Sequence, residues 1–250
     1  MNTSVRKPYA ALDKNSRQEK AHKIEAILST VLALKGARVL EVGTGSGIIA
    51  NHLSKCVGPD GKVIAVDVTD QLQVRDGFRF FQVKDTELPF EDISFDAVIS
   101  NHVMEHVGDR KAQLHHLQEI RRVLKENGWA YLAVPNRWRL IEPHFKLPLL
   151  SWLPIDLRST YVRLIGRGEV YDCNPPSHSG LISLFKEAKL NHNEQSFEAM
   201  RIMVDVESVS FPARLVLKIP RFILQMLFPI IPTMIFLLSR QPERVDTDFE

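Results

Sequence analysis

The chain has 250 residues, of which 44% are hydrophobic, and its formal net charge at pH 7 is +2. This length allows one domain with an insertion and a substantial buried core. The nearly balanced charge and the lack of a recognisable nucleic-acid-binding motif argue against an RNA- or DNA-binding protein. The two cysteines, Cys56 and Cys173, form no metal or redox motif, which favours a reducing, cytoplasmic compartment.

Residues 1–35 are predicted to form a polar arm followed by a helix, ahead of a main domain at 36–206. Residues 1–18 are polar and charged and lack the apolar stretch of a signal peptide. Four apolar residues then follow the i, i+3, i+4, i+7 spacing of one helix face: Ile24, Ile27, Leu28 and Val31.

A strand at 37–42 and a helix near 46–56 flank a glycine-rich turn. Its glycines alternate with other residues: Gly43, Gly45 and Gly47. Glycine permits positive φ and lets a ligand approach the backbone closely. The spacing is not that of a phosphate-binding loop, and Ile48 replaces the third small residue of a dinucleotide fingerprint. Glu41 directly before the turn suits a ligand that carries an ammonium group and no phosphate.

The next segments are predicted to alternate between strands and helices. Strands are expected at 62–67, 78–83, 95–100 and 129–134, and helices at 69–76 and 109–126. Such alternation indicates an α/β fold with a doubly wound, mostly parallel sheet and helices on both faces. Asp67 ends the second strand, 20 residues after Gly47, where an acid can bind both hydroxyls of a ribose.

Residues 85–100 comprise Asp-Thr-Glu-Leu-Pro-Phe-Glu-Asp-Ile-Ser-Phe-Asp-Ala-Val-Ile-Ser, and Asn-His-Val-Met-Glu-His-Val follows at 101–107. In these residues and the glycine turn, the chain resembles the class I S-adenosylmethionine (SAM)-dependent methyltransferases. The resemblance is to the group that includes the ubiquinone- and menaquinone-biosynthesis methyltransferases, and it extends over residues 36–135. It implies a Rossmann-like seven-stranded sheet, SAM as the cofactor and methyl transfer as the activity.

The resemblance also implies roles for particular residues. The methionine end of SAM would lie against residues in and before the glycine turn: Glu41, Gly43, Thr44, Gly45 and Gly47. Asp67, with Val68 beside it, would bind the ribose. Asp85, with Thr86 beside it, would accept a hydrogen bond from the adenine amino group. The residues alone leave two alternatives open: Asp85 as a turn acid and Gly47 as a spacer at a helix start.

Asn101 and His102 follow the strand at 95–100, and the resemblance places them beside the methionine moiety. His102, Glu105 and His106 also match H-x-x-E-H, an inverted zinc-protease signature. A third metal ligand at a recognisable spacing is missing, and cofactor motifs flank the segment on both sides. We therefore interpret it as a helix start at the rim of the cofactor pocket and predict no metal site.

Residues 136–176 are predicted to form a cap over the acceptor pocket. The segment is rich in proline and aromatic residues, which argues against disorder, and it is too long for a plain connection. A helical stripe follows at Leu181, Leu184, Phe185 and Ala188. Strand-like residues at 195–206 are expected to complete the sheet with an antiparallel pair.

Residues 207–250 are predicted to form an apolar, helical C-terminal extension. The stretch from Phe222 to Leu238 has no charged residue, but Pro229 and Pro232 interrupt it and argue against a spanning helix. Three interpretations stay open: short helices packed on the domain, peripheral contact of 211–240 with the inner face of a membrane, or the lining of a pocket for a lipophilic acceptor.

Methyl transfer from a sulfonium requires alignment, and an oxygen acceptor also requires a base. We predict O-methylation of a small, lipid-linked or glycan acceptor, with His144 as the base and His106 or His178 as alternatives. The competing hypothesis is a non-catalytic scaffold of a membrane-associated biosynthetic complex, which predicts degraded cofactor motifs. Glu41 and Asp67 are intact, which favours an enzyme.

Overall fold

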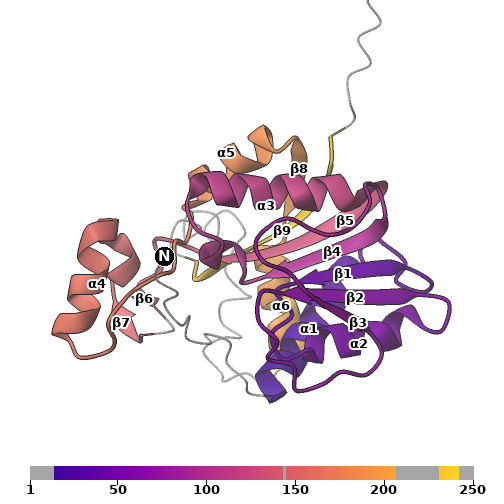
Figure 1. The fold of residues 1–250 in the computed structure, drawn as a ribbon, viewed down its shortest axis with the longest axis horizontal. Coiled ribbons are helices and arrows are strands. Elements are labelled where there is room, and N and C mark those ends of the chain that lie inside the picture. Colours follow the sequence, from indigo (N-terminus) through magenta and orange to yellow (C-terminus); the bar gives the residue numbers. More distant parts are fainter. Residues whose placement is uncertain (1–13, 143–144, 207–230, 242–250) are drawn as a thin grey trace, which may run out of the picture.

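A computed structural model describes residues 14–142, 145–206 and 231–241. Its centre is a seven-stranded sheet with the order β3-β2-β1-β4-β5-β9-β8 (Figure 1). The strands are β1 (Arg38–Val42), β2 (Lys62–Asp67), β3 (Arg79–Gln82), β4 (Phe95–Asn101), β5 (Leu124–Pro135), β8 (Leu190–Glu194) and β9 (Thr233–Arg240). Pairing is parallel from β3 to β5, and β9 runs antiparallel to both of its neighbours. The predicted seven-stranded, mostly parallel sheet is confirmed.

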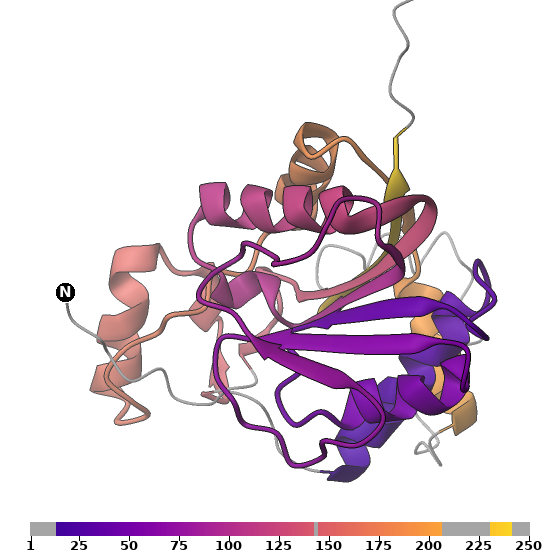
Figure 2. The same cartoon turned by 45° about the vertical axis from the view of Figure 1, so that its right-hand side comes forward.

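Helices cover both faces of the sheet (Figures 1 and 2). One face carries α3 (Arg110–Val123) and α5 (His178–Glu187). The other carries α1 (Lys14–Leu28), α2 (Ile48–Val57) and α6 (Ser196–Val206). This arrangement explains why the inner strands are apolar on both sides.

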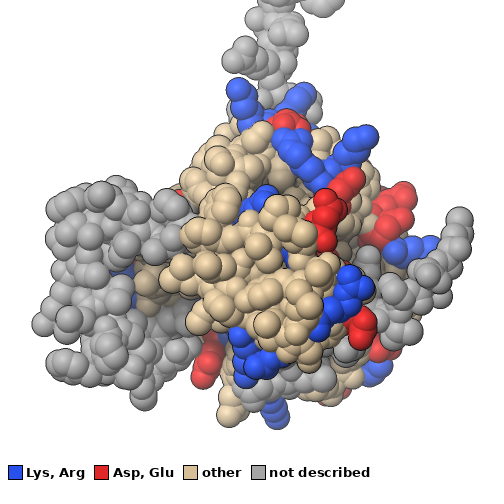
Figure 3. Space-filling view, turned by 90° about the vertical axis from the view of Figure 1, so that its left-hand side faces the viewer, with Lys and Arg blue, Asp and Glu red and all other residues tan. Residues whose placement is uncertain are grey.

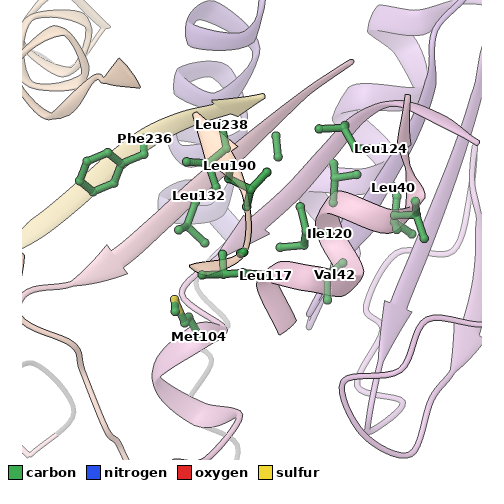
Figure 4. Close-up of a cluster of buried hydrophobic side chains, with 14 of the residues drawn as sticks. Leu40, Val42, Met104, Leu117, Ile120, Leu124, Leu132, Leu190, Phe236 and Leu238 are labelled. Atoms are coloured by element: carbon green, nitrogen blue, oxygen red, sulfur yellow. The ribbon is translucent and has the colours of Figure 1, made fainter. Parts of the chain in front are cut away.

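Two hydrophobic cores lie on opposite faces of the sheet, and successive strand residues alternate between them. Leu40 and Val42 of β1 pack with Leu117 and Ile120 of α3 (Figure 4). Val39, between Leu40 and Arg38 in the strand, belongs instead to the core under α1 and α2. Each fully buried aliphatic side chain contributes about 1.5–3 kcal/mol, so these two cores supply most of the stability of the domain.

The sheet is completed by residues that differ from those predicted. Residues 196–206 form helix α6, not a strand, because Ala199 and Ile202 lie three positions apart and pack on the same core. The final strand is β9, whose residues Met234–Leu238 are all buried. A strand covered on both faces has a continuous apolar run without alternation. This run accounts for the mistaken prediction of an apolar helical segment.

The prediction of a helical extension at 207–250 with membrane contact through 211–240 is therefore wrong for β9. Residues 207–230 and 242–250 lie outside the described part of the chain. Within the described ranges, no helix combines the length and apolarity that crossing a membrane requires.

The helix predicted at 69–76 is also absent from the described structure, where these residues form an irregular loop. The amides of Gln73 and Val74 donate to the carbonyl of Ser46, at 2.9 and 3.1 Å. Arg75 pairs with Asp70 at 2.8 Å. The backbone groups that a helix would use internally thus hold this loop against the glycine turn.

Residues between β5 and α5 form a small unit beside the sheet (Figure 1). It contains a hairpin of β6 (Ile141–Glu142) and β7 (Leu147–Pro148), the short helix η2 (Leu150–Trp152) and α4 (Ile155–Leu164). Five buried residues make a separate core: Leu147, Leu150, Val162, Tyr171 and Cys173. The sequence analysis predicts an acceptor cap in this segment, and that role stays a prediction. We call the unit the cap below.

We predict that Phe236→Ala lowers the free energy of unfolding by about 3–5 kcal/mol, because the ring is fully buried between Phe185 and its core neighbours. Urea titration followed by circular dichroism measures this loss. Ser239→Ala, at a half-buried position of the same strand, serves as the control and should change stability by less than about 0.5 kcal/mol. Equal effects of the two substitutions would contradict the placement of β9 inside the sheet.

Candidate cofactor and acceptor site

The candidate site lies where the carboxyl ends of β2, β1 and β4 meet. The three strands are adjacent, and Val42 at the end of β1 is aligned with Val66 in β2 and Ser100 in β4. The glycine turn after β1 therefore lies between the last residues of its neighbours, Asp67 and Asn101. Ligands of open α/β sheets bind at this edge.

Two glycines of the turn have no room for a side chain. Gly43 and Gly47 have φ of 74° and 77°, in the left-handed region that favours glycine. A Cβ on Gly47 would lie 2.4 Å from the carbonyl oxygen of Val74, and one on Gly43 would lie 2.3 Å from Val103 Cγ2. Gly47 is both the residue before α2 and a contact point for the loop at 69–77, so the spacer interpretation alone is insufficient.

Asp67 holds the glycine turn from the neighbouring strand. Its Oδ2 accepts from the amide of Gly45 at 2.8 Å, and its Oδ1 accepts from the amide of Thr69 at 3.2 Å. The residue is half-buried, and Val68 after it is 36% exposed. An acid and an apolar side chain thus stand side by side at the end of β2, as a ribose and an adjoining aromatic base would require.

Glu41 is a buried carboxylate in the centre of the site. It is 1% exposed, and its Oε2 accepts a 2.7 Å hydrogen bond from the Thr44 hydroxyl. Burial raises the pKa of Glu41 to about 7, although Thr44 and Arg17 partly oppose that shift. A carboxylate in such surroundings gains strongly from a cationic ligand.

Arg17 is a site residue that the sequence analysis missed. It is 8% exposed on α1, and burial lowers its pKa while the charges of Glu41 and Asp67 raise it. The buried face of α1 also contains Ala21 and Ile24, which continue the helical spacing from Arg17. A positively charged residue at helical spacing from the apolar face of α1 was the sequence signal that could have identified Arg17 as buried.

Asp85 and Thr86 lie on the loop after β3. Asp85 is exposed, and its Oδ1 accepts from the amide of Glu87 at 2.9 Å, as a turn acid does. The Thr86 hydroxyl lies 2.6 Å from His115 Nδ1 on α3. The structure thus shows the local role of Asp85, and its role in adenine binding stays a prediction.

The segment after β4 turns sharply into the short helix η1 (Met104–His106). Asn101 is 7% exposed, and His102 has a φ of 58° and donates its amide to Ala133 at 2.9 Å. Because His102 precedes η1 in a left-handed conformation, the two histidines of H-x-x-E-H do not share one α-helix face. The zinc-protease interpretation is therefore excluded by the local backbone.

The three predicted base candidates have different surroundings. His144 lies outside the described residues. His106 is on η1, with Nδ1 3.7 Å from Cys173 Sγ of the cap. His178 lies 3.6 Å from Glu194 at the end of β8, two strands beyond β5. Of the two that the structure describes, only His106 lies beside the end of β4.

Comparison with known proteins finds similarity to methyltransferases. Residues 40–132 match the family described as "Methyltransferase domain". The chain is 35% identical over 104 residues to the ubiquinone/menaquinone biosynthesis C-methyltransferase UbiE of Hahella chejuensis, covering 37% of this chain and 41% of the relative. UbiE of Serratia proteamaculans is 26% identical over 190 residues, with 71% and 69% covered. The chain spans about two fifths of the length of the first curated relatives it matches.

Solved structures share the fold at low sequence identity. A chain in the complex between the Haloferax volcanii Trm112 methyltransferase activator and a methyltransferase has a TM-score of 0.58, 19% identity and coverage of 94% and 96%. A SAM-dependent methyltransferase from Mesorhizobium loti has a TM-score of 0.59, 12% identity and coverage of 89% and 100%. The chain is thus similar to a methyltransferase domain over residues 40–132, and it shares its fold with solved methyltransferase structures.

We predict that Gly47→Ala lowers the free energy of unfolding by more than Gly36→Ala does, although both glycines have a φ of 77°. A Cβ on Gly36 would meet nothing within 4 Å, so that substitution reports only the backbone strain of about 1–2 kcal/mol. Gly47→Ala must also displace the Val74 carbonyl. Chemical denaturation of both variants gives the difference, and equal losses would show that the loop at 69–77 does not pack on the glycine turn.

Proposed function

We propose that the protein transfers a methyl group from SAM to a hydrophobic small-molecule acceptor. The observation that carries this proposal is the pair of carboxylates, Glu41 and Asp67, that flank the glycine turn at the carboxyl edge of the sheet. SAM is a zwitterion with an α-ammonium group, a carboxylate and a cationic sulfur, and it has no phosphate. Two acids and no phosphate-binding loop match that charge pattern.

The residues of the site would divide the cofactor between them. Glu41 would accept from the ammonium group, and Arg17 would bind the carboxylate of the methionine moiety. Asp67 would bind the ribose hydroxyls, with Val68 against the adenine ring and Asp85 near its amino group. When SAM is bound, its sulfonium supplies an activated methyl group. The chain then has to exclude water and align the acceptor.

The cap supports a hydrophobic acceptor. Ten large apolar residues of this segment are at least 37% exposed: Trp138, Leu140, Ile141, Leu149, Trp152, Ile155, Leu157, Leu164, Ile165 and Val170. The described residues on this side of the molecule form a largely uncharged surface in Figure 3, with charged side chains mainly around its margin. Exposed apolar surface of this extent is typical of an interaction site. An acceptor that is lipid-linked or partitions into membranes fits it better than a glycan does.

Oxygen, carbon and nitrogen all stay open as the acceptor atom, and transfer to oxygen or carbon needs a proton removed. The sequence analysis favours oxygen, while the curated relatives are named as C-methyltransferases. SAM consumption with a quinol-like acceptor, followed by mass spectrometry of the product, identifies the methylated atom. A product methylated only on carbon would overturn the O-methylation hypothesis and leave methyl transfer intact.

We predict that Asp67→Ala weakens SAM binding by about 10- to 100-fold, because hydrogen bonds to a charged group contribute about 1.5–3 kcal/mol. Calorimetric titration with SAM and with its demethylated product gives the dissociation constants. Asp70→Ala is the matched control. Asp70 lies a few residues after Asp67, pairs with Arg75 and faces solvent. Unchanged affinity in Asp67→Ala, or no binding by the folded wild type, would refute the proposed cofactor site.

We predict that SAM affinity falls as the pH decreases below about 7. The pKa of Glu41 is about 7 in the free protein, so the carboxylate becomes protonated below that value and must ionise again to accept the ammonium group. The dissociation constant should rise by up to about tenfold per pH unit. Titrations between pH 5.5 and 7.5 measure the slope. Glu41→Gln should bind more weakly and without this slope, and a slope that persists would assign it to another group.

A further inference from the structure

We infer that His106, Asp172 and Cys173 form a binding site for a transition-metal ion, with zinc as the ion that the ligands favour. One imidazole nitrogen, one carboxylate oxygen and one thiol sulfur lie within 4.8 Å of one another. His106 belongs to η1 at the end of β4, and the other two residues belong to the segment by which the cap returns to α5. The site thus joins the cap to the methyltransferase sheet.

The distances suit a tetrahedral ion. His106 Nδ1 lies 3.7 Å from Cys173 Sγ, and Asp172 Oδ1 lies 4.0 Å from the same sulfur. Zinc bonds of about 2.0–2.3 Å at tetrahedral angles place ligand atoms roughly 3.3–3.6 Å apart. The two contacts of Cys173 need movements of up to about half an ångström to reach this spacing. All three ligand atoms lie within 4.8 Å of one another, so His106 and Asp172 would have to approach each other by up to about 1.5 Å on binding. A mixed set of nitrogen, sulfur and oxygen ligands is typical of zinc, and magnesium and calcium prefer oxygen alone.

Glu105 provides an independent observation. Its side chain is 1% exposed, and among the described residues neither carboxylate oxygen has a hydrogen-bond partner. Oε1 lies 3.9 Å from His106 Nε2, the ring nitrogen opposite the one that faces Cys173, and 3.4 Å from His102 Nδ1. A metal-bound histidine usually donates its other ring N–H to a carboxylate. Glu105 lies on the side of the His106 ring where such a carboxylate would be expected.

Charge balance supports a cation at the same place. Glu105 and Asp172 each carry a negative charge when ionised. Cys173 adds another negative charge once it binds a metal as thiolate. Two cations of the cap, Arg139 and Arg158, interact electrostatically with Cys173. Arg139 pairs with Glu142 at 2.6 Å, and Arg158 donates to the backbone carbonyls of Leu153 and Ser151. A buried carboxylate without hydrogen bonds is costly unless positive charge lies near it.

The backbone holds the ligands in place before any ion arrives. The amide of Asn174 donates to the carbonyl of Glu105 at 2.7 Å, and Gln113 Nε2 donates to the carbonyl of Asn174 at 2.7 Å. These bonds fix the residue after Cys173 against η1 and α3. Three protein ligands leave a fourth position for water or for an oxygen atom of the acceptor. The acceptor role rests on the proposed function, whereas the metal site does not.

The test is metal binding by the full chain after chelator treatment and dialysis. Competition between the protein and a chromophoric zinc chelator should give one tight zinc ion per chain. Cobalt should give the d–d absorption of a tetrahedral site and a thiolate-to-cobalt charge-transfer band. Cys173→Ser and, separately, His106→Gln should each weaken zinc binding by at least about 100-fold, and Cys173→Ser should remove the charge-transfer band. Circular dichroism establishes that each variant is folded.

Three further variants make the result specific. Glu105→Gln should weaken zinc binding by about 10- to 100-fold and keep the cobalt spectrum, as expected of a positioning residue. Cys56→Ser keeps Cys173 and should bind as the wild type does. His52→Gln alters the other candidate cluster of His22, Glu25 and His52, and it should also have no effect.

Folded protein that binds no zinc, or binding lost in His52→Gln but kept in Cys173→Ser, would overturn the proposal. SAM titration of the metal-free protein is a separate readout. If the metal-site proposal is wrong, the SAM affinity of the protein is unaffected. If the proposed SAM site is wrong, the zinc affinity is unaffected.

Discussion

The buried carboxylate of Glu41 is the constraint around which the rest of the site is arranged. It lies near the end of β1, where it is 1% exposed and accepts a hydrogen bond from Thr44 of the glycine turn. Such a group is unfavourable in isolation, and its raised pKa reflects that cost. Thr44, the charge of Arg17 and the proposed ammonium group each offset part of it. The free protein therefore has an energetic cost at Glu41 that a cationic ligand, as proposed, would offset.

The cap has a different organisation, with polar groups inside its small core. Arg158 is 1% exposed and donates to the carbonyls of Leu153 and Ser151, and Arg139 pairs with Glu142. These interactions specify one arrangement of a segment too small to do so by apolar burial alone. Because its core is separate from the sheet, the cap relates to the cofactor site chiefly through its two connections and the contacts around Cys173.

Prediction from the sequence succeeded where a local pattern of residues is compatible with only one kind of structure. The strands from β1 to β5, the glycine turn and Asp67 were predicted because apolar runs alternate with turn residues at fixed spacing. Predictions failed where a tertiary contact decided the outcome. The loop at 69–77 is held by Ser46, and β9 is apolar because both of its faces are covered. Arg17 and Cys173 reach their sites from distant parts of the chain. The helical spacing of Arg17 with Ala21 and Ile24 was the one local signal for Arg17, and no local motif indicates the position of Cys173.

The position of β9 in the sheet also bears on how the protein folds. β9 separates β5 from β8, and Ala130 in β5 pairs with Leu238. Until residues 233–240 have been synthesised, the edges of β5 and β8 that pair with β9 have no partner strand. The backbone groups and apolar side chains at these edges are then exposed to pairing with other chains. Contacts between such distant residues form slowly because a long loop must close first. During synthesis the growing chain therefore passes through a period in which aggregation competes with folding, and chaperone protection would matter most then.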